Sequence, residues 1–250
     1  MRKLFLLTLL LLTTTLLSAQ TVADYIREAK ALIAKLDETG AYPLLLKAIK
    51  ADNKNVEALT LAALYASREG NRQQNKGLRN GYFNQGKVFI DAAMRLSPDD
   101  AEVNYVMAVV LGRIALVSSS KEKVAVSRQI KEVIDKAIKI NPNHAGAWHA
   151  LGKWNYEVSQ LSFIEKGAVN MLFGGLPTGD LKTALSAYAK CLQLRQDYLL
   201  YYLDYAKALA KNDQKDLAIA QLRKLISLPN GTQDDAAIKT EAASLIAEWK

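Results

Sequence analysis

Two short stretches of the sequence, MRLSPDDAEV at residues 94–103 and IKINPNHAGA at residues 138–147, decide the fold. Each stretch ends one segment of periodic apolar residues, places a proline near its centre and leads into another such segment. Proline cannot continue a helix, and it disfavours the helical conformation of the residue before it. Both stretches therefore predict a helix end, a short turn and a new helix.

Aligning the chain on these two turns divides it into five units. The first and last units have the 34-residue length of a tetratricopeptide repeat (TPR), which is a helix–turn–helix unit. The eighth position of each unit holds a small residue, which lets two helices approach closely: Ala29, Ala63, Ala108, Gly152 and Ala206. We therefore predict one domain over residues 20–250, with units at 22–55, 56–100, 101–144, 145–198 and 199–232.

The three middle units are longer than a standard repeat, and their extra residues fall where the two helices of a unit join. Residues 233–249 predict one more amphipathic helix, of the kind that seals the open end of a solenoid. No stretch has the alternating pattern of a strand. The predicted fold is all-α: a TPR-like α-α solenoid of about five helical hairpins, with lengthened middle hairpins and a C-terminal capping helix.

The insert of the fourth unit contains a short apolar segment, Leu161 to Phe173, which Gly174 and Gly175 end. Its apolar residues recur every three or four positions and predict one apolar helix face: Leu161, Ile164, Ala168, Met171 and Leu172. We expect this face to pack on the neighbouring hairpins, because the inserts of the second and third units lie on the same edge. The alternative is that it roofs the concave groove.

The first residues have the three-part layout of a signal peptide: Met1-Arg2-Lys3 is basic, Leu4 to Leu17 is mostly apolar, and Ser18-Ala19-Gln20 is small and polar. The apolar run is too short to span a bilayer comfortably. We expect residues 1–19 to be removed, leaving a mature chain with no transmembrane segment. The expected location is the periplasm or the extracellular space.

The composition argues against several classes of function. The chain has 33 Lys and Arg residues against 25 Asp and Glu, but the positive charges are spread along the helices and do not cluster as in nucleic-acid binders. One cysteine excludes an intrachain disulfide and a cysteine-based zinc cluster, and two histidines argue against most metal sites. No catalytic constellation is visible. We expect no enzyme activity, no catalytic or metal-binding residue, no cofactor and no nucleic-acid partner.

The concave face is the expected binding surface, because the first helix of each unit lines it in TPR-type stacks. The sequence places tyrosine, histidine, arginine and lysine there, which can hold carboxylate or phosphate groups through charge-assisted hydrogen bonds. A solvated surface with ordinary charges is the simpler alternative. The candidate residues are Arg68, Tyr105, Arg113, His149, Lys153, Tyr156, Lys207 and Lys211.

The stretch LGKWNYEVSQLSFIEK at residues 151–166, within the longer run from Ser118 to Leu194, resembles the regulator of microtubule dynamics family. This is a divergent TPR-like family with lengthened helical hairpins, and the resemblance supplies no catalytic residues. It implies association with microtubules or organelle contacts, as in eukaryotic members, one of which binds phospholipid. The signal peptide instead indicates an exported, bacterial-type member, so we do not expect the tubulin role to apply.

Two functions are consistent with these observations. The first is a non-enzymatic scaffold that binds a protein or peptide partner through its concave face. The second is a carrier for a lipid or small amphiphile, suggested by the resemblance and by the apolar insert as a roof over the groove.

Overall fold

The computed structural model describes residues 20–249, so the predicted signal peptide at residues 1–19 lies outside the described range. Within residues 20–249 the regular structure is helical and no strand is present. The helices are α2 (Val22–Ala34), α3 (Glu38–Ala51), α4 (Val56–Arg72), α5 (Lys76–Leu96), α6 (Ala101–Val117), α7 (Ser120–Ile140), α8 (Ala145–Ser159), α9 (Phe163–Phe173), α10 (Leu181–Leu194), α11 (Leu199–Lys211), α12 (Lys215–Ser227) and α13 (Asp235–Trp249).

The helix boundaries follow local sequence signals. Pro98 lies between the end of α5 and the start of α6, and Pro142 lies between α7 and α8, as the two proline stretches predict. Asn55, Asp100 and Asp180 each cap the following helix by accepting a hydrogen bond from a backbone N–H three residues later. The turns before these three helices are therefore specified by residues within the turns.

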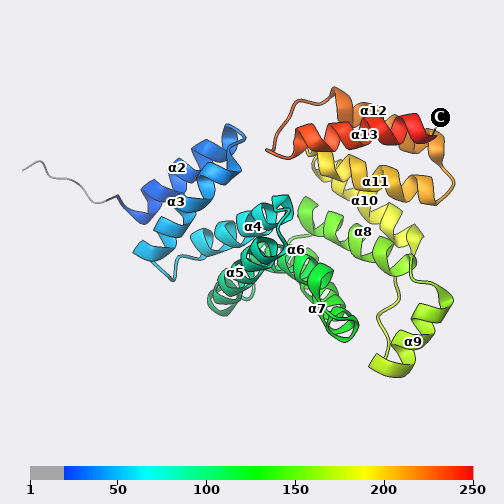
Figure 1. The fold of residues 1–250 in the computed structure, drawn as a ribbon, viewed down its shortest axis with the longest axis horizontal. Coiled ribbons are helices and arrows are strands. Elements are labelled where there is room, and N and C mark those ends of the chain that lie inside the picture. The colour runs from blue at the N-terminus through cyan, green and yellow to red at the C-terminus, as the bar shows by residue number, and fades with distance from the viewer. Residues whose placement is uncertain (1–19, 250) are drawn as a thin grey trace, which may run out of the picture.

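Successive helices pack as pairs, and the pairs form a curved stack (Figure 1). The pairs are α2–α3, α4–α5, α6–α7, α8–α10 and α11–α12, and α13 packs on the last pair. The helices α4, α6, α8 and α11 contact one another in turn and form the inner row, whereas α5 and α7 lie outside it (Figure 1). This confirms the predicted all-α, TPR-like solenoid. None of the described helices is both long enough and apolar enough to span a bilayer.

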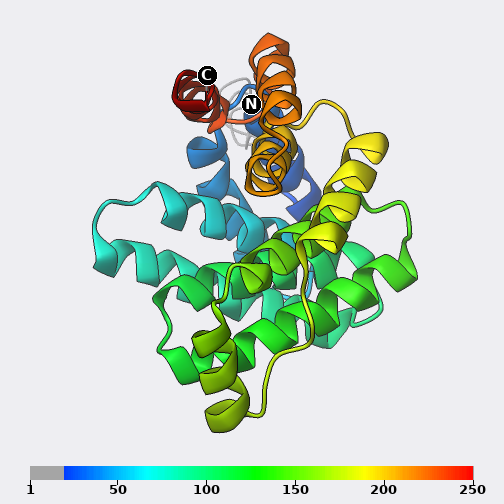
Figure 2. The same cartoon turned by 90° about the vertical axis from the view of Figure 1, so that its right-hand side faces the viewer.

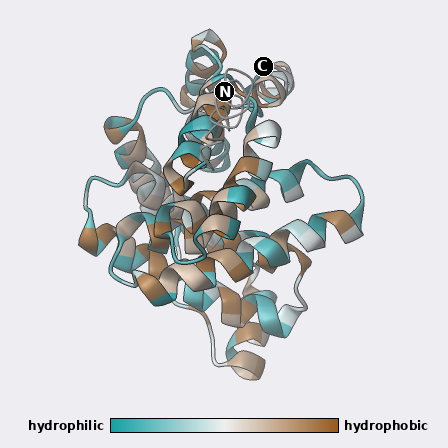
Figure 3. Cartoon of the chain, turned by 90° about the vertical axis from the view of Figure 1, so that its left-hand side faces the viewer, coloured by the Kyte–Doolittle hydropathy of each residue, from teal (hydrophilic) through white to brown (hydrophobic). Residues whose placement is uncertain are grey.

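The core is a series of hydrophobic clusters, as expected for a solenoid in which each unit contacts its neighbours. Hydrophobic and hydrophilic residues alternate along individual helices (Figure 3), so each helix turns an apolar face to its neighbours. All five small residues at the eighth position of the predicted units are buried. They allow the inner helices to lie close to their partners.

Gly152 shows how tight these contacts are. A Cβ atom at Gly152 would lie 2.7 Å from Cδ1 of Tyr188, which is fully buried on α10. The contact lies on the expected helix but about one turn beyond Ala184, the residue that the repeat register suggests. The ring of Tyr188 therefore occupies the space that a side chain on α8 would fill.

The expected packing of the apolar face of α9 is wrong. Ile164 is 80% exposed, Met171 81% and Leu172 65%. The orientation of α9 is set at its end, where Arg128 of α7 donates from Nε to the carbonyl of Gly175 at 2.9 Å and from Nη2 to the carbonyl of Phe173. The side of α9 toward the body carries Lys166, Val169 and Asn170 and borders a pocket of about 190 Å³.

The alternative position for α9, as a roof over the groove, is not observed either. α9 contacts the outer helix α7 and lies beyond the C-terminal end of α8 (Figure 1). Gly174 and Gly175 have φ angles of 73° and 80°, a left-handed conformation that favours glycine and turns the chain back toward α10. The apolar side of this helix therefore faces away from the solenoid.

We predict that Gly152→Leu destabilises the protein by about 1–3 kcal/mol, because the added side chain collides with the ring of Tyr188. Urea unfolding measures the change. Gly112→Ala in α6 is the control, since nothing lies within 4 Å of its added Cβ, and alanine favours a helix over glycine. A Gly152→Leu variant as stable as the wild type would contradict the observed contact.

We further predict that the double variant Ile164→Ser and Leu172→Ser changes the free energy of unfolding by less than about 1 kcal/mol, because both side chains are exposed. The comparison is Ile134→Ala, which removes a fully buried side chain and should cost about 2–5 kcal/mol. Thermal unfolding followed by circular dichroism distinguishes them. A large loss in the double variant would show that α9 packs against the body.

Candidate functional site

The inner row of helices carries all eight predicted concave-face residues. Arg68 lies on α4; Tyr105 and Arg113 lie on α6; the remaining residues are His149, Lys153 and Tyr156 on α8, and Lys207 and Lys211 on α11. The structure brings these helices together in the order α4, α6, α8 and α11. Side chains that are far apart in the sequence therefore share one surface.

An acidic residue that the sequence did not single out, Asp204 of α11, organises the part of this surface that α8 and α11 form. His149 donates from Nε2 to Oδ2 of Asp204 at 3.0 Å, and Nζ of Lys153 lies 3.6 Å from Oδ1. Burial opposes the ionisation of Asp204, but the hydrogen bond from His149 and the charge of Lys153 outweigh it and lower its pKa to about 2. Asp204 therefore remains ionised and holds two groove residues of α8.

A series of aromatic rings, in which Tyr201 is buried, continues from His149 toward α4. His149 stacks on Tyr201 with ring centroids 4.7 Å apart, and Tyr201 lies 4.6 Å from Tyr198. The hydroxyl of Tyr198 accepts a hydrogen bond of 2.8 Å from Nη2 of Arg68. Since Arg68 and Tyr198 are 130 residues apart, this contact joins helices from distant parts of the solenoid.

Tyr105 lies between the second and third inner helices. Its ring contacts the ring of His144, with centroids 4.9 Å apart, and occupies the space beside Gly146, where a Cβ atom would lie 2.7 Å from Cζ of Tyr105. His144 also caps α8 and hydrogen bonds Glu102 at 2.8 Å. His144, the other histidine of the chain, therefore has a structural role.

Arg113 differs from the other groove cations. Its Nη1 donates to Oδ1 of Asn71 at 3.1 Å, and within residues 20–249 no carboxylate oxygen lies within 4.0 Å of its guanidinium. Burial lowers the pKa of Arg113 from its usual value, which the negative charges of Asp204 and Asp234 only partly oppose. Arg113 is thus a half-buried cation without a matching carboxylate.

The remaining predicted residues lie at the margin of this surface. Tyr156 is half-buried, and Nζ of Lys153 lies 5.9 Å from the centre of its ring. Lys207 pairs with Glu241 of α13 at 2.6 Å, which turns it toward the cap. Lys211 is exposed at the end of α11. The structure therefore gathers the first five predicted residues, places Tyr156 at the margin beside Lys153, and leaves Lys207 and Lys211 apart from them.

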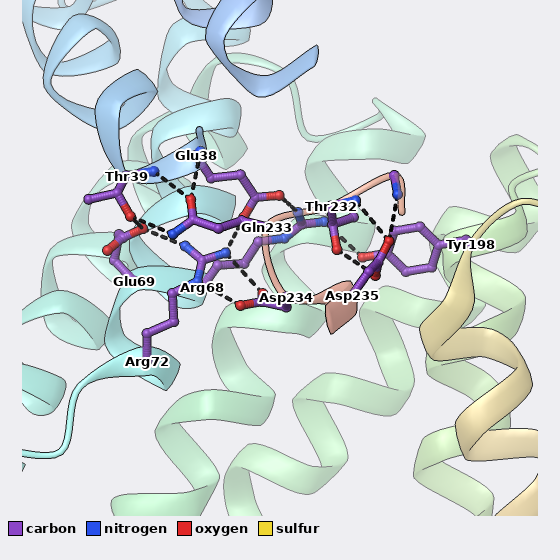
Figure 4. Close-up of polar contacts among 11 residues, drawn as sticks. Glu38, Thr39, Arg68, Glu69, Arg72, Tyr198, Thr232, Gln233, Asp234 and Asp235 are labelled. Atoms are coloured by element: carbon purple, nitrogen blue, oxygen red, sulfur yellow. Dashed lines mark hydrogen bonds and ion pairs between the residues drawn. The ribbon is translucent and has the colours of Figure 1, made fainter. Parts of the chain in front are cut away.

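A second polar cluster, which sequence reasoning missed, lies where the two ends of the solenoid meet (Figure 4). We call it the end cluster; its members are Glu38, Thr39, Arg68, Glu69, Arg72, Gln233 and Asp234. The only signal in the sequence was three charged residues on the last turns of α4. Their partner Asp234 is 162 residues away, and only the curvature of the stack places it there.

The site offers binding groups, and neither a metal cluster nor a reactive thiol is found among the described residues. No group of three or more histidine, cysteine, aspartate or glutamate side chains within residues 20–249 is arranged to hold a metal ion. Cys191 is fully buried, and burial raises the pKa of its thiol to about 12, which keeps it protonated. The surface instead combines tyrosine rings with one incompletely paired guanidinium.

Comparison with known proteins places the chain in a family. Its residues 25–250 match the regulator of microtubule dynamics protein 1-3 family. Regulator of microtubule dynamics protein 1 from Caenorhabditis elegans is 26% identical over 162 residues, which cover 65% of this chain and 72% of that protein. Protein 3 from Xenopus laevis is 27% identical over 173 residues, covering 67% of this chain and 36% of that protein. The chain thus spans about a third of the length of the frog relative.

The solved structures show the same fold class. A thermophilic TPR protein from Thermus thermophilus superimposes with a TM-score of 0.65, at 17% sequence identity, over 91% of this chain and 100% of that protein. This similarity concerns the fold alone. The sequence match and the stack of helical hairpins together show that the chain belongs to the regulator of microtubule dynamics protein 1-3 family and has a TPR-like fold.

Proposed function

We propose that this protein is a non-enzymatic scaffold whose concave face binds an acidic segment of a protein partner. The family and the TPR-like fold support a protein-binding scaffold, since stacked helical repeats present extended concave surfaces to partners. Residues 1–19 predict a signal peptide, so we place the partner in the periplasm or the extracellular space.

The single observation that carries the proposal is the incomplete pairing of Arg113. A guanidinium has five N–H donors, and the only side-chain partner of Arg113 within residues 20–249 is the amide oxygen of Asn71. Removing a charge from water is costly unless an opposite charge and hydrogen bonds compensate. A carboxylate of a partner supplies both, because carboxylate and guanidinium can form two parallel hydrogen bonds.

The surroundings of Arg113 fit a peptide segment. Tyr198 supplies a half-buried aromatic ring near it, and arginine and tyrosine are both enriched where protein interfaces derive most of their binding energy. The other central cations are already neutralised: Arg68 pairs with Glu38 and Lys153 with Glu157 and Asp204. Arg113 is therefore where a partner adds a charge interaction without breaking one.

The position of α9 does not support the alternative function, a carrier for a lipid or amphiphile. Besides the family resemblance, this alternative depended on the insert covering the groove, whereas α9 lies beside the outer helix α7. The centre of the concave face is lined by ionised and hydrogen-bonded side chains, which an acyl chain would desolvate without replacing their partners. We therefore retain the protein-binding function alone.

A random peptide library displayed on phage tests the proposal. We expect selection against the full chain to enrich peptides rich in aspartate or glutamate, and Arg113→Gln to weaken their binding about tenfold or more, because hydrogen bonds to charged groups contribute about 1.5–3 kcal/mol. Arg223→Gln is the matched control, since Arg223 is exposed on α12. Fluorescence anisotropy with the synthetic peptides measures the affinities.

Two results would contradict the proposal. One is enrichment of peptides without acidic residues. The other is equal weakening by Arg113→Gln and Arg223→Gln, which would indicate nonspecific attraction by a basic protein.

A further inference from the structure

The two ends of the solenoid are joined by a short segment that precedes the last helix. Residues 231–235, which we call the strap, extend from the C-terminal hairpin to α3 and α4 (Figures 1 and 4). Figure 2 shows α13 and the N-terminal hairpin at the same end of the molecule, and the strap that precedes α13 contacts the start of α3. The stack of helices is thus closed into a ring around the concave face.

Gln233 of the strap binds the start of α3. Its Oε1 accepts hydrogen bonds from the backbone N–H groups of Glu38 at 2.8 Å and Thr39 at 3.0 Å, and its Nε2 donates to Oγ1 of Thr39 at 2.9 Å. The first N–H groups of a helix have no partner within the helix. Gln233 therefore completes the N-terminus of a helix about 195 residues earlier in the chain.

Asp234 binds α4 in the geometry of a strong ion pair. Nε of Arg72 lies 2.7 Å from Oδ1 and Nη2 lies 2.9 Å from Oδ2, so the two groups form parallel hydrogen bonds. The same guanidinium also pairs with Glu38 and Glu69, both nearly fully buried. One arginine thus links the N-terminal hairpin, the second unit and the strap.

The strap has a fixed shape of its own. Asp235 accepts hydrogen bonds from the backbone N–H groups of Gly231 at 2.7 Å and Thr232 at 2.8 Å, and from the hydroxyl of Thr232 at 2.6 Å. These bonds hold the loop in a turn before α13 begins. Gln233 and Asp234 are therefore presented to α3 and α4 by a preorganised loop.

The closure lacks the apolar contacts that hold the units together. Among the described residues, the clusters of the N-terminal end contain residues of α2 to α5, and the cluster of the C-terminal end contains residues of α10 to α13. No hydrophobic cluster contains residues of both ends. Opening the ring here exposes polar groups that water can solvate, so it does not forfeit the hydrophobic contacts within the units.

The strap and the proposed binding site meet on one turn of α4. Asn71, which hydrogen bonds Arg113, is the neighbour of Arg72 in the sequence. The carboxylate of Asp234 therefore lies close to Arg113, the cation without a matching carboxylate.

From these contacts we propose that the strap is a polar latch that holds the solenoid closed, and that its release admits the partner segment to the concave face. The second part rests on the proposed function, whereas the first does not.

The distance between the two ends tests the latch without any ligand. Spin labels attached to the variant Ala31→Cys in α2 and Ala247→Cys in α13, both exposed positions, report this distance in the full chain by pulsed electron paramagnetic resonance. The native Cys191 needs no replacement, since it is fully buried. We expect the combined variant Gln233→Ala and Asp234→Asn to shift the distances to longer values and to broaden their distribution.

The matched control is Glu248→Gln, which removes an exposed charge from α13 outside the strap. It should leave the distribution unchanged. The unsubstituted labelled chain gives a second measurement that does not depend on a variant: raising sodium chloride to ~1 M, where the screening length is about 3 Å, should also lengthen and broaden the distances. Circular dichroism should show full helicity in both cases.

The latch is overturned if the strap variant and the high-salt sample both keep the narrow distribution of the wild type, or if Glu248→Gln broadens it equally. Selected acidic peptides then test admission separately. They should associate severalfold faster with the strap variant than with the wild type, and an unchanged association rate would overturn the gating role. A failure to select any peptide would contradict the proposed function and leave the distance measurement decisive for the latch.

Discussion

The close approach of two helices at one small residue in each unit is the constraint on which this structure depends. Where Gly152 faces Tyr188, the space for even a methyl group is occupied, and the alanines in the same position are buried. Such contacts fix how each inner helix lies on its partner. They thereby set the curvature of the stack, and the curvature brings α11 to α4 and the strap to α3. The binding surface follows from this packing.

The sequence predicts what is local and repeats. Pro98 and Pro142 mark the turns, and the small residues mark the helix contacts, because each depends on the backbone or on the nearest neighbours. The direction of α9 was not predictable from its apolar pattern, since a guanidinium on α7 and two left-handed glycines decide it. The end cluster was not predictable from the sequence for a different reason. Small rotations add up over five hairpins before Asp234 meets Arg72.

The sequence predicted which side chains line the concave face, but it did not predict which residues they pair with. Repeat positions indicated Arg68, His149 and Lys153, whereas the carboxylates of Glu38 and Asp204 that pair with them come from other units. Buried ion pairs often contribute little net stability, because desolvation offsets the attraction. They do fix geometry: Asp204 holds His149 in a defined orientation against Tyr201. Arg113 stands out because the neighbouring cations are already paired with carboxylates.

The two kinds of contact in this molecule act at different levels. Apolar contacts join each helix to the next, and their loss means unfolding of a unit. The contacts that close the ring are hydrogen bonds and ion pairs of a few side chains, which water can replace at modest free energy. A ring held in this way can open while every hairpin stays folded. Because the closing carboxylate of Asp234 lies near Arg113, the electrostatics of closure and of binding are physically linked, and an acidic partner that enters the groove alters the field that holds the strap.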